Sequence, residues 1–157
     1  MAVDQEIIER VLDAIPQTTP FRFIDEIIEL DENRIVSAYR FKEDEYFYEG
    51  HFPGKPITPG VILVETMAQA GVVALGIYQL LKNGLKEEEI RQITTLFALI
   101  DSVEFSGIVN PGERVIVSGE KIYFRKGNLK SKVSIEKEDG TSVCHGILTG
   151  AGVNYNA

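Results

Sequence analysis

The chain has 157 residues, of which 44% are hydrophobic, and a formal net charge of -8 at pH 7. This length and apolar content suit a single domain, residues 1–157, with one substantial core. The acidic balance argues against nucleic acid and against an anionic membrane surface as the main partner, because both attract Lys and Arg.

The first predicted element is a short amphipathic helix within residues 1–16. Its apolar residues recur at helical intervals between acidic ones, and Pro16 ends the pattern. We expect this helix to pack its apolar face on the rest of the domain. Acidic residues also stand where a signal peptide requires a basic end, so we predict no targeting segment here. The apolar positions are Ile7, Ile8, Val11, Leu12 and Ile15.

Two strands are predicted next, at residues 22–30 and 34–42. Both are rich in apolar and aromatic residues, and the turn-forming residues 31–33 separate them. This arrangement predicts a first antiparallel hairpin. The residues that follow, 43–60, are dense in aromatic residues, Pro and Gly, and are expected to form a loop.

Residues 61–82 are predicted to form a long helix that is apolar on nearly every side. Asn83 and Gly84 provide its C-terminal stop. At a rise of about 1.5 Å per residue the helix spans roughly 30 Å, the width of a small domain. The same length would suit a membrane span, but Glu65 and Gln69 interrupt the apolar run. We therefore expect the helix to cross the middle of the protein.

The remainder of the chain is predicted to be mostly strand, because Val, Ile, Phe, Tyr and Thr are frequent in it. Turn signals at 110–112, 126–128 and 139–140 separate the strands, so we expect each strand to pair antiparallel with its neighbour in the sequence. Only this sheet can cover the long helix. The chain therefore predicts an α+β fold, with one curved antiparallel sheet wrapped around the helix. The predicted strands are residues 91–105, 113–125, 129–138 and 141–153.

Cys144 is the only cysteine, which excludes an internal disulfide and favours a reducing cytoplasm as the location. The two histidines, His51 and His145, lie far apart in the sequence and give no zinc-binding spacing. We therefore predict a cytoplasmic protein without a metal or a redox cofactor.

The loop before the long helix places a histidine in rigid surroundings. Pro53, Pro56 and Pro59 each fix a backbone angle, so this segment holds His51 and the helix start at Gly60 in a set relation. A histidine side chain of ordinary pKa, about 6.5, is a neutral base at physiological pH. The first amide of a helix, backed by the positive end of the helix dipole, can polarise a carbonyl oxygen.

Glu65 stands inside the apolar run of the helix, and Gln69 lies one turn further on the same face. A carboxyl group buried among hydrocarbon is costly unless it is paired or kept protonated by a raised pKa, and a protonated carboxyl is what a general acid requires. A histidine base, this acid and a helix amide can together remove a proton next to a carbonyl and expel a hydroxyl one carbon further on. Each feature alone also has an ordinary structural explanation, as a surface histidine or a hydrogen-bonded core acid.

The segment HFPGKPITPGVILVETMAQ, residues 51–69, closely resembles the signature of the 3-hydroxyacyl-[acyl-carrier-protein] dehydratases. These are hot-dog-fold enzymes of fatty acid synthesis, and the resemblance is to the branch that uses Glu as its acid. The similarity extends to residues 20–25, 47–50 and 109–113. Most of residues 18–150 can be laid on the family.

The resemblance implies roles for individual residues. His51 matches the family's catalytic histidine, Glu65 its catalytic acid, and Gly60 the backbone donor to the thioester carbonyl. Gln69 matches a helix glutamine that orders the site. Thr58 stands where the family usually has a bulky apolar residue, which predicts an altered substrate tunnel. We expect three neighbouring residues to contact the substrate as well: Phe52, Pro59 and Val61.

In the family, the histidine and the acid of one site come from different subunits of a dimer, with the acyl chain in a tunnel along the interface. The resemblance therefore implies a homodimer, with further assembly into a trimer of dimers left open. It also implies an acyl carrier protein bearing a 3-hydroxyacyl chain as the partner.

We predict a dehydratase that converts a (3R)-3-hydroxyacyl thioester into the trans-2-enoyl thioester and water. An acyl thioesterase of the same fold is one alternative, and it would use Glu65 to activate water. A non-catalytic acyl-binding module is another, and it would bind the thioester without turnover. The sequence leaves the acyl-chain length and the identity of the carrier open.

Overall fold

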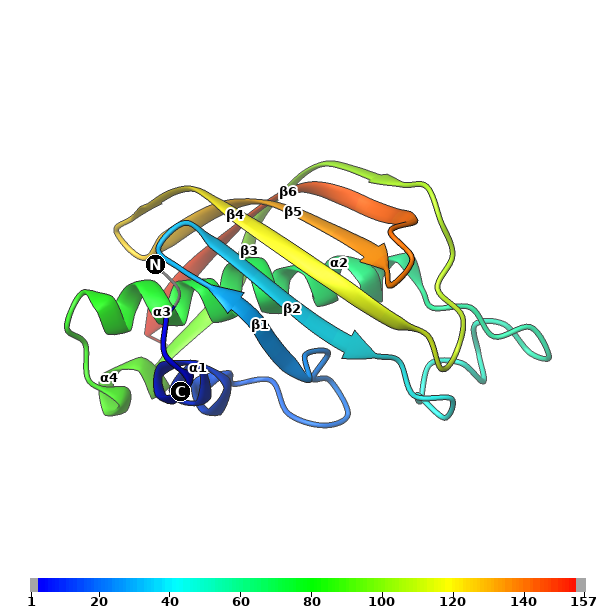
Figure 1. Ribbon diagram of the computed structural model, residues 1–157, viewed down its shortest axis with the longest axis horizontal. Helices are drawn as coiled ribbons and strands as arrows, with labels where there is room; N and C mark the ends of the chain where they lie inside the picture. The colour runs from blue at the N-terminus through cyan, green and yellow to red at the C-terminus, as the bar shows by residue number, and fades with distance from the viewer. Residues whose placement is uncertain (1–2, 155–157) are drawn as a thin grey trace.

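The long helix forms the centre of the structure, a computed structural model that describes residues 3–154 (Figure 1). It runs without a break through α2 (Gly60–Ala68), the π-helical segment η1 (Gln69–Ala74) and α3 (Leu75–Lys82). All residues of η1 are buried. The helix is long and apolar enough to cross a membrane, but most of it lies inside the protein, which identifies it as a core helix. The predicted buried helix over 61–82 is thus confirmed.

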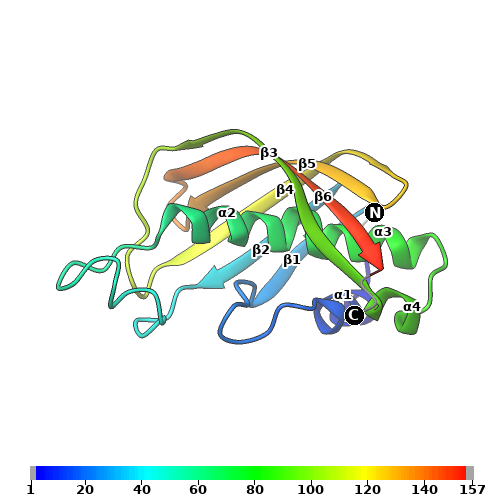
Figure 2. The same ribbon diagram turned by 180° about the vertical axis from the view of Figure 1, so that it is seen from behind.

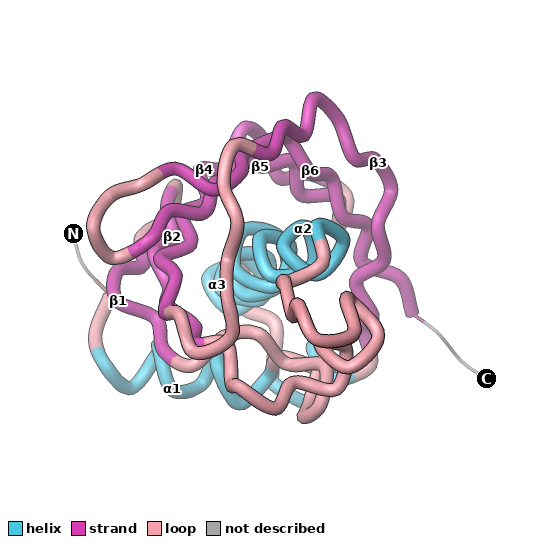
Figure 3. The backbone as a smooth tube through the Cα atoms, turned by 90° about the vertical axis from the view of Figure 1, so that its right-hand side faces the viewer, coloured by secondary structure: helices cyan, strands magenta, loops and turns pink. Residues whose placement is uncertain are grey.

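An antiparallel sheet of six strands wraps around this helix (Figure 2). Seen along the helix, the strands form an arc over it (Figure 3). Their order across the sheet is β1-β2-β4-β5-β6-β3. The prediction of an α+β fold with a curved sheet around a central helix is confirmed. The strands are β1 (Glu26–Leu30), β2 (Arg34–Arg40), β3 (Ile93–Phe105), β4 (Arg114–Arg125), β5 (Asn128–Lys137) and β6 (Ser142–Asn154).

One predicted pairing is wrong, because β3 and β4 are neighbours in the sequence but not in the sheet. β4 pairs with β2, from Arg34 opposite Glu120 to Arg40 opposite Arg114. β3 pairs with β6 at the other end of the strand order. The connection at 106–113 therefore crosses one end of the sheet (Figure 1). β4 pairs with the free edge of β2 in the first hairpin. β3 therefore pairs with the edge that remains open, that of β6.

The predicted strand at 22–30 begins later than expected, at Glu26. The reason is a side chain that competes for the backbone. The buried Gln69 binds the Phe21 carbonyl and the Phe23 amide, so these groups do not pair with a neighbouring strand. The first hairpin itself is present, since β1 pairs antiparallel with β2.

Two short helices lie near the end of α3 (Figure 1). The helix expected within residues 1–16 is α1 (Gln5–Ala14). The helix α4 (Glu87–Arg91) was not predicted, and it delays the start of β3, expected at residue 91, to Ile93. An ion pair of 2.6 Å between Arg10 Nε and Glu87 Oε1 joins the two helices.

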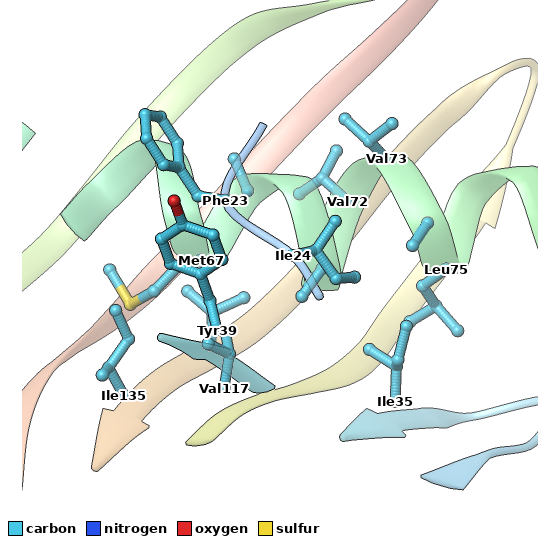
Figure 4. Packing of buried hydrophobic residues seen from close by; sticks show 14 of the residues in the cluster. Phe23, Ile24, Ile35, Tyr39, Met67, Val72, Val73, Leu75, Val117 and Ile135 are labelled. Atoms are coloured by element: carbon cyan, nitrogen blue, oxygen red, sulfur yellow. The ribbon is translucent and has the colours of Figure 1, made fainter. Parts of the chain in front are cut away.

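The helix packs directly against the sheet at two glycines. A Cβ atom on Gly119 of β4 would stand 2.6 Å from the Gly71 Cα atom, so no larger residue fits there without a shift of the backbone. The Ser131 hydroxyl of β5 donates a hydrogen bond of 2.7 Å to the Gly71 carbonyl. Buried side chains such as Met67 and Val117 fill the space between helix and sheet (Figure 4). These contacts hold the residues of the helix at a fixed depth.

Candidate active site

His51 lies in a tightly hydrogen-bonded loop that extends beyond the first turn of α2 (Figure 1). Phe52 and Lys55 exchange backbone hydrogen bonds of 3.0 and 2.8 Å, and the Ile57 amide donates to the His51 carbonyl at 2.9 Å. The His51 Nδ1 atom is 2.8 Å from the Ile57 carbonyl oxygen. Because a carbonyl oxygen only accepts, Nδ1 carries a proton, and in the neutral form of the ring Nε2 offers a lone pair. The Phe52 ring stacks on the imidazole, with ring centroids 4.0 Å apart.

A pair of buried hydroxyl groups anchors this loop to the core. The hydroxyl oxygens of Tyr48 and Thr58 are 2.7 Å apart, and the Thr58 amide donates to the Val109 carbonyl at 3.0 Å. Burial raises the pKa of the Tyr48 hydroxyl, which keeps it neutral. An apolar residue in place of Thr58 would leave that hydroxyl buried without this partner. Thr58 lines neither of the two cavities at the helix described below, and the altered substrate tunnel stays a prediction.

The helix begins directly at the end of the loop. Pro59 is its N-cap, and the Pro59 carbonyl accepts a hydrogen bond of 3.0 Å from the Ile62 amide. The Gly60 amide precedes the first intrahelical donor, the Ile62 amide, so the helix itself offers it no acceptor. A Cβ atom on Gly60 would stand 3.2 Å from the Phe105 ring, so a side chain there requires the ring to move. Val61 is 75% exposed at the same end of the helix.

Glu65 lies in the second turn of α2, where Gln69 holds its carboxyl group. The Gln69 side-chain nitrogen donates to Glu65 Oε1 at 2.9 Å and to the Phe21 carbonyl at 2.8 Å, and its oxygen accepts from the Phe23 amide at 2.7 Å. These contacts use both donors of the amide and fix its orientation. Burial raises the pKa of the Glu65 carboxyl, and the hydrogen bond from Gln69 opposes part of that rise. The protonated acid is therefore favoured relative to an exposed glutamate.

Two small cavities follow the helix from Glu65. The first, of ≈ 40 Å³, is lined by Gln17, Glu65 and Ala68 and by residues 95–97 of β3. The second, of ≈ 50 Å³, extends to Gly76 of α3 and is mostly apolar. The acid therefore stands at one end of a narrow apolar region along the helix. Four lining residues are common to both cavities: Val72, Val73, Thr95 and Gly150.

The structure brings some of the predicted site residues together and not others. Glu65 and Gln69 are in direct contact, and Phe52 stacks on His51. His51 is not among the residues that line the cavity at Glu65. Gln17 does line that cavity, although a single glutamine in a loop carries no pattern by which the sequence could indicate it.

A curved antiparallel sheet wrapped around one central helix is the hot-dog fold. The dehydratase heterocomplex ApeI:P from Xenorhabdus doucetiae matches it with a TM-score of 0.76 at 14% identity, over 92% of this chain and 91% of that chain. A mutant of a thioesterase from Pseudomonas aeruginosa matches with a TM-score of 0.63 at 13% identity, over 94% of each chain. At these identities the two structures show the fold alone.

The family follows from the sequence comparisons. The FabA-like domain model matches residues 15–146. The 3-hydroxyacyl-[acyl-carrier-protein] dehydratase FabZ of Caldicellulosiruptor bescii is 37% identical over 142 residues, 90% of this chain and 94% of the relative. The FabZ of Bacillus licheniformis is 35% identical over 141 residues, 89% of this chain and 91% of the relative. The chain therefore belongs to the FabA-like family, among the FabZ 3-hydroxyacyl-[acyl-carrier-protein] dehydratases, as the resemblance of residues 51–69 predicts.

Proposed function

We propose that this chain dehydrates (3R)-3-hydroxyacyl thioesters on an acyl carrier protein to trans-2-enoyl thioesters, in the cytoplasm, during acyl-chain synthesis. The observation that carries the proposal is Glu65, a carboxyl group held by Gln69 at a largely apolar cavity, with a pKa raised by burial. The names of the relatives favour dehydration over the thioesterase and the non-catalytic alternatives. In this proposal residues 1–157 act as one domain, with 43–60 as the active-site loop.

Two proton transfers balance the proposed reaction. Nε2 of His51 removes a proton from C2, the electron pair left behind forms the C2–C3 double bond, and the C3–O bond breaks. Glu65 gives its proton to the departing oxygen, which leaves as water. The Gly60 amide stabilises the negative charge that develops on the thioester oxygen. These steps need no cofactor. The residues proposed to contact the substrate around them are Phe52, Pro59, Val61 and Gln69.

A second copy of the chain is part of the proposal, because β3 is an edge strand and is exposed along most of its length. The exposed side chains include Leu96, Phe97, Leu99 and Ile100. An apolar edge strand of this kind is normally covered or paired. β3 crosses beside the central helix (Figure 2), and its residues 95–97 line the Glu65 cavity.

Pairing of β3 with β3 of a second copy would cover these apolar side chains and close the site. We therefore propose a homodimer in which Glu65 of one subunit acts with His51 of the partner subunit. The position of His51 outside the lining of the Glu65 cavity supports this arrangement. Assembly of such dimers into a trimer of dimers is compatible with the proposal but is not required by it.

The proposed activity is tested by following two products at once. The purified protein is mixed with a (3R)-3-hydroxyacyl thioester of acyl carrier protein or coenzyme A. We expect the absorbance of a conjugated enoyl thioester to appear without release of free thiol. Thiol release without that absorbance would identify a thioesterase, and binding without either product would identify a non-catalytic module. Either result would refute the proposal.

A further inference from the structure

The cavity beside Glu65 contains a polar group for which the proposed acid and base leave no role. The side-chain carbonyl oxygen of Gln17 is buried, and it receives a hydrogen bond from none of the residues that the structure describes. A buried acceptor without a donor is unfavourable and is rare in folded proteins. Gln17 lines the same ≈ 40 Å³ cavity as Glu65.

The remaining walls of this cavity offer Gln17 little else to bind. Ala68, Val72 and Phe97 are apolar, and the Thr95 methyl group faces Gly150, where a Cβ atom would stand 2.9 Å from Thr95 Cγ2. The cavity of ≈ 40 Å³ can hold at least one oxygen atom with its hydrogens, because a water molecule needs only about 10–15 Å³. The cavity that Gln17 and Glu65 line therefore has room for a hydroxyl group or a water molecule.

Gln17 and Glu65 offer complementary hydrogen-bonding groups to a molecule in the cavity. Glu65 Oε1 already accepts from Gln69, so the proton of the neutral acid is available on Oε2 as a donor. Gln17 Oε1 is an acceptor. A hydroxyl group donates one hydrogen bond and accepts others, so it can satisfy both sides at once.

We propose that Gln17 is a substrate-binding residue whose side-chain oxygen accepts a hydrogen bond from the 3-hydroxyl group in the cavity that it shares with Glu65. This inference rests on the proposed dehydratase function and extends it. With its hydrogen directed at Gln17, the hydroxyl oxygen turns a lone pair toward Glu65.

The elimination then releases the 3-hydroxyl group as water. When the base removes the C2 proton, the C3–O bond breaks and its electron pair stays on the oxygen. That oxygen takes the Glu65 proton and becomes water, which donates one hydrogen bond to Gln17 and the other to the Glu65 carboxylate. The proton on the base is released to solvent, and the Glu65 carboxylate takes up a proton before the next turnover.

The test compares substrates with and without the hydroxyl group in the variant Gln17→Leu. We expect kcat/KM for the 3-hydroxyacyl thioester to fall about tenfold, the effect of one lost hydrogen bond in a buried site. The inhibition constant of the saturated acyl thioester of equal length should stay within about twofold, because that ligand has no hydroxyl for Gln17 to bind. Gln5→Leu makes the same chemical change at an exposed position of α1 and serves as the control.

Unchanged kcat/KM in Gln17→Leu would overturn the inference. An equal loss for the saturated thioester would also overturn it, because it would show that Gln17 only supports the fold. Thermal unfolding checks each variant, and Gln17→Met replaces Gln17→Leu if the branched side chain prevents folding. If the wild-type chain forms no enoyl product at all, the proposed function itself fails and this inference fails with it.

Discussion

The two groups assigned to acid–base chemistry lie in contrasting surroundings. His51 stands in a partly exposed loop shaped by backbone hydrogen bonds, and a backbone carbonyl orients its ring. Glu65 lies on the core helix, where the fully buried Gln69 holds it beside a cavity. The backbone thus sets the direction of the base, whereas burial favours the protonated form of the acid. The two regions should therefore respond differently to mutation and to pH.

The largest effect is expected at the base. His51→Ala should lower kcat/KM at least about 100-fold, the low end of what a positioned base contributes. The fold should survive, because the ring lies in a partly exposed loop. His145→Ala is the matched control, since His145 is an exposed histidine of β6 that pairs with Glu104 at 3.4 Å. Near-normal turnover in His51→Ala would remove this residue from the mechanism.

On the acid side, activity and stability should separate. Glu65→Gln keeps an acceptor for Gln69 but cannot protonate the leaving group, so kcat/KM should fall about 100-fold. The folded protein binds the Glu65 proton more tightly than the unfolded chain does, because burial raises its pKa above the ordinary value of 4.5. The contribution of Glu65 to wild-type stability therefore declines as pH rises from about 4.5 through the raised pKa.

Glu65→Gln removes that decline. Denaturant unfolding should show the variant to be at least as stable as the wild type at pH 7, with no such advantage at pH 4. A variant that is inactive and also clearly less stable at pH 7 would contradict this account, because the carboxyl would then serve the fold rather than the reaction.

A smaller effect is expected from filling the cavity beyond Glu65, and it should change the preference for acyl-chain length. Gly76→Leu places a side chain in the second cavity, so kcat/KM for long acyl chains should fall about tenfold relative to short ones. Gly76→Ala is the control, because its Cβ atom would stand at an ordinary contact distance of 3.6 Å from Leu129 Cδ2. Kinetics over a series of chain lengths measure the ratio. An equal loss at all lengths would mean that the acyl chain does not enter this cavity.

The smallest effect on catalysis is expected at the loop anchor, the hydrogen bond between Tyr48 and Thr58, where the predicted change is in stability. Thr58→Val leaves the buried Tyr48 hydroxyl without its partner and should cost about 1–3 kcal/mol of stability. Tyr48→Phe combined with Thr58→Val removes both polar groups, so the double variant should lose less than the sum of the single losses. Thermal unfolding of the four proteins gives this coupling. Additive losses would show that the two hydroxyl groups do not support each other.

The central helix and the residues it carries were predictable because their signals are local. An apolar run on nearly every side predicts a buried helix, and Gly84, with a φ of +89°, follows its end at Asn83 as expected. The segment from His51 to Gln69 was recognisable from its order of residue types alone.

The wrong predictions arise where a contact between distant parts of the chain decides the local structure. The strand expected from residue 22 begins at Glu26 because Gln69, far along the chain, takes the backbone groups of Phe21 and Phe23. The pairing of β3 with β6 follows from which sheet edge is free, and Gln17 becomes notable only through its place in a cavity. Such facts depend on the tertiary structure and leave no pattern in the local sequence.

The central claim, a site shared between two copies of the chain, is tested most directly with hybrid dimers. His51→Ala and Glu65→Gln subunits carrying different tags are co-expressed, and dimers that bear both tags are isolated. Each hybrid should contain one complete site and one site with both changes, so we expect roughly half of the wild-type activity from two inactive parents. A hybrid as inactive as its parents would contradict the account, because the base and the acid would then have to come from the same subunit.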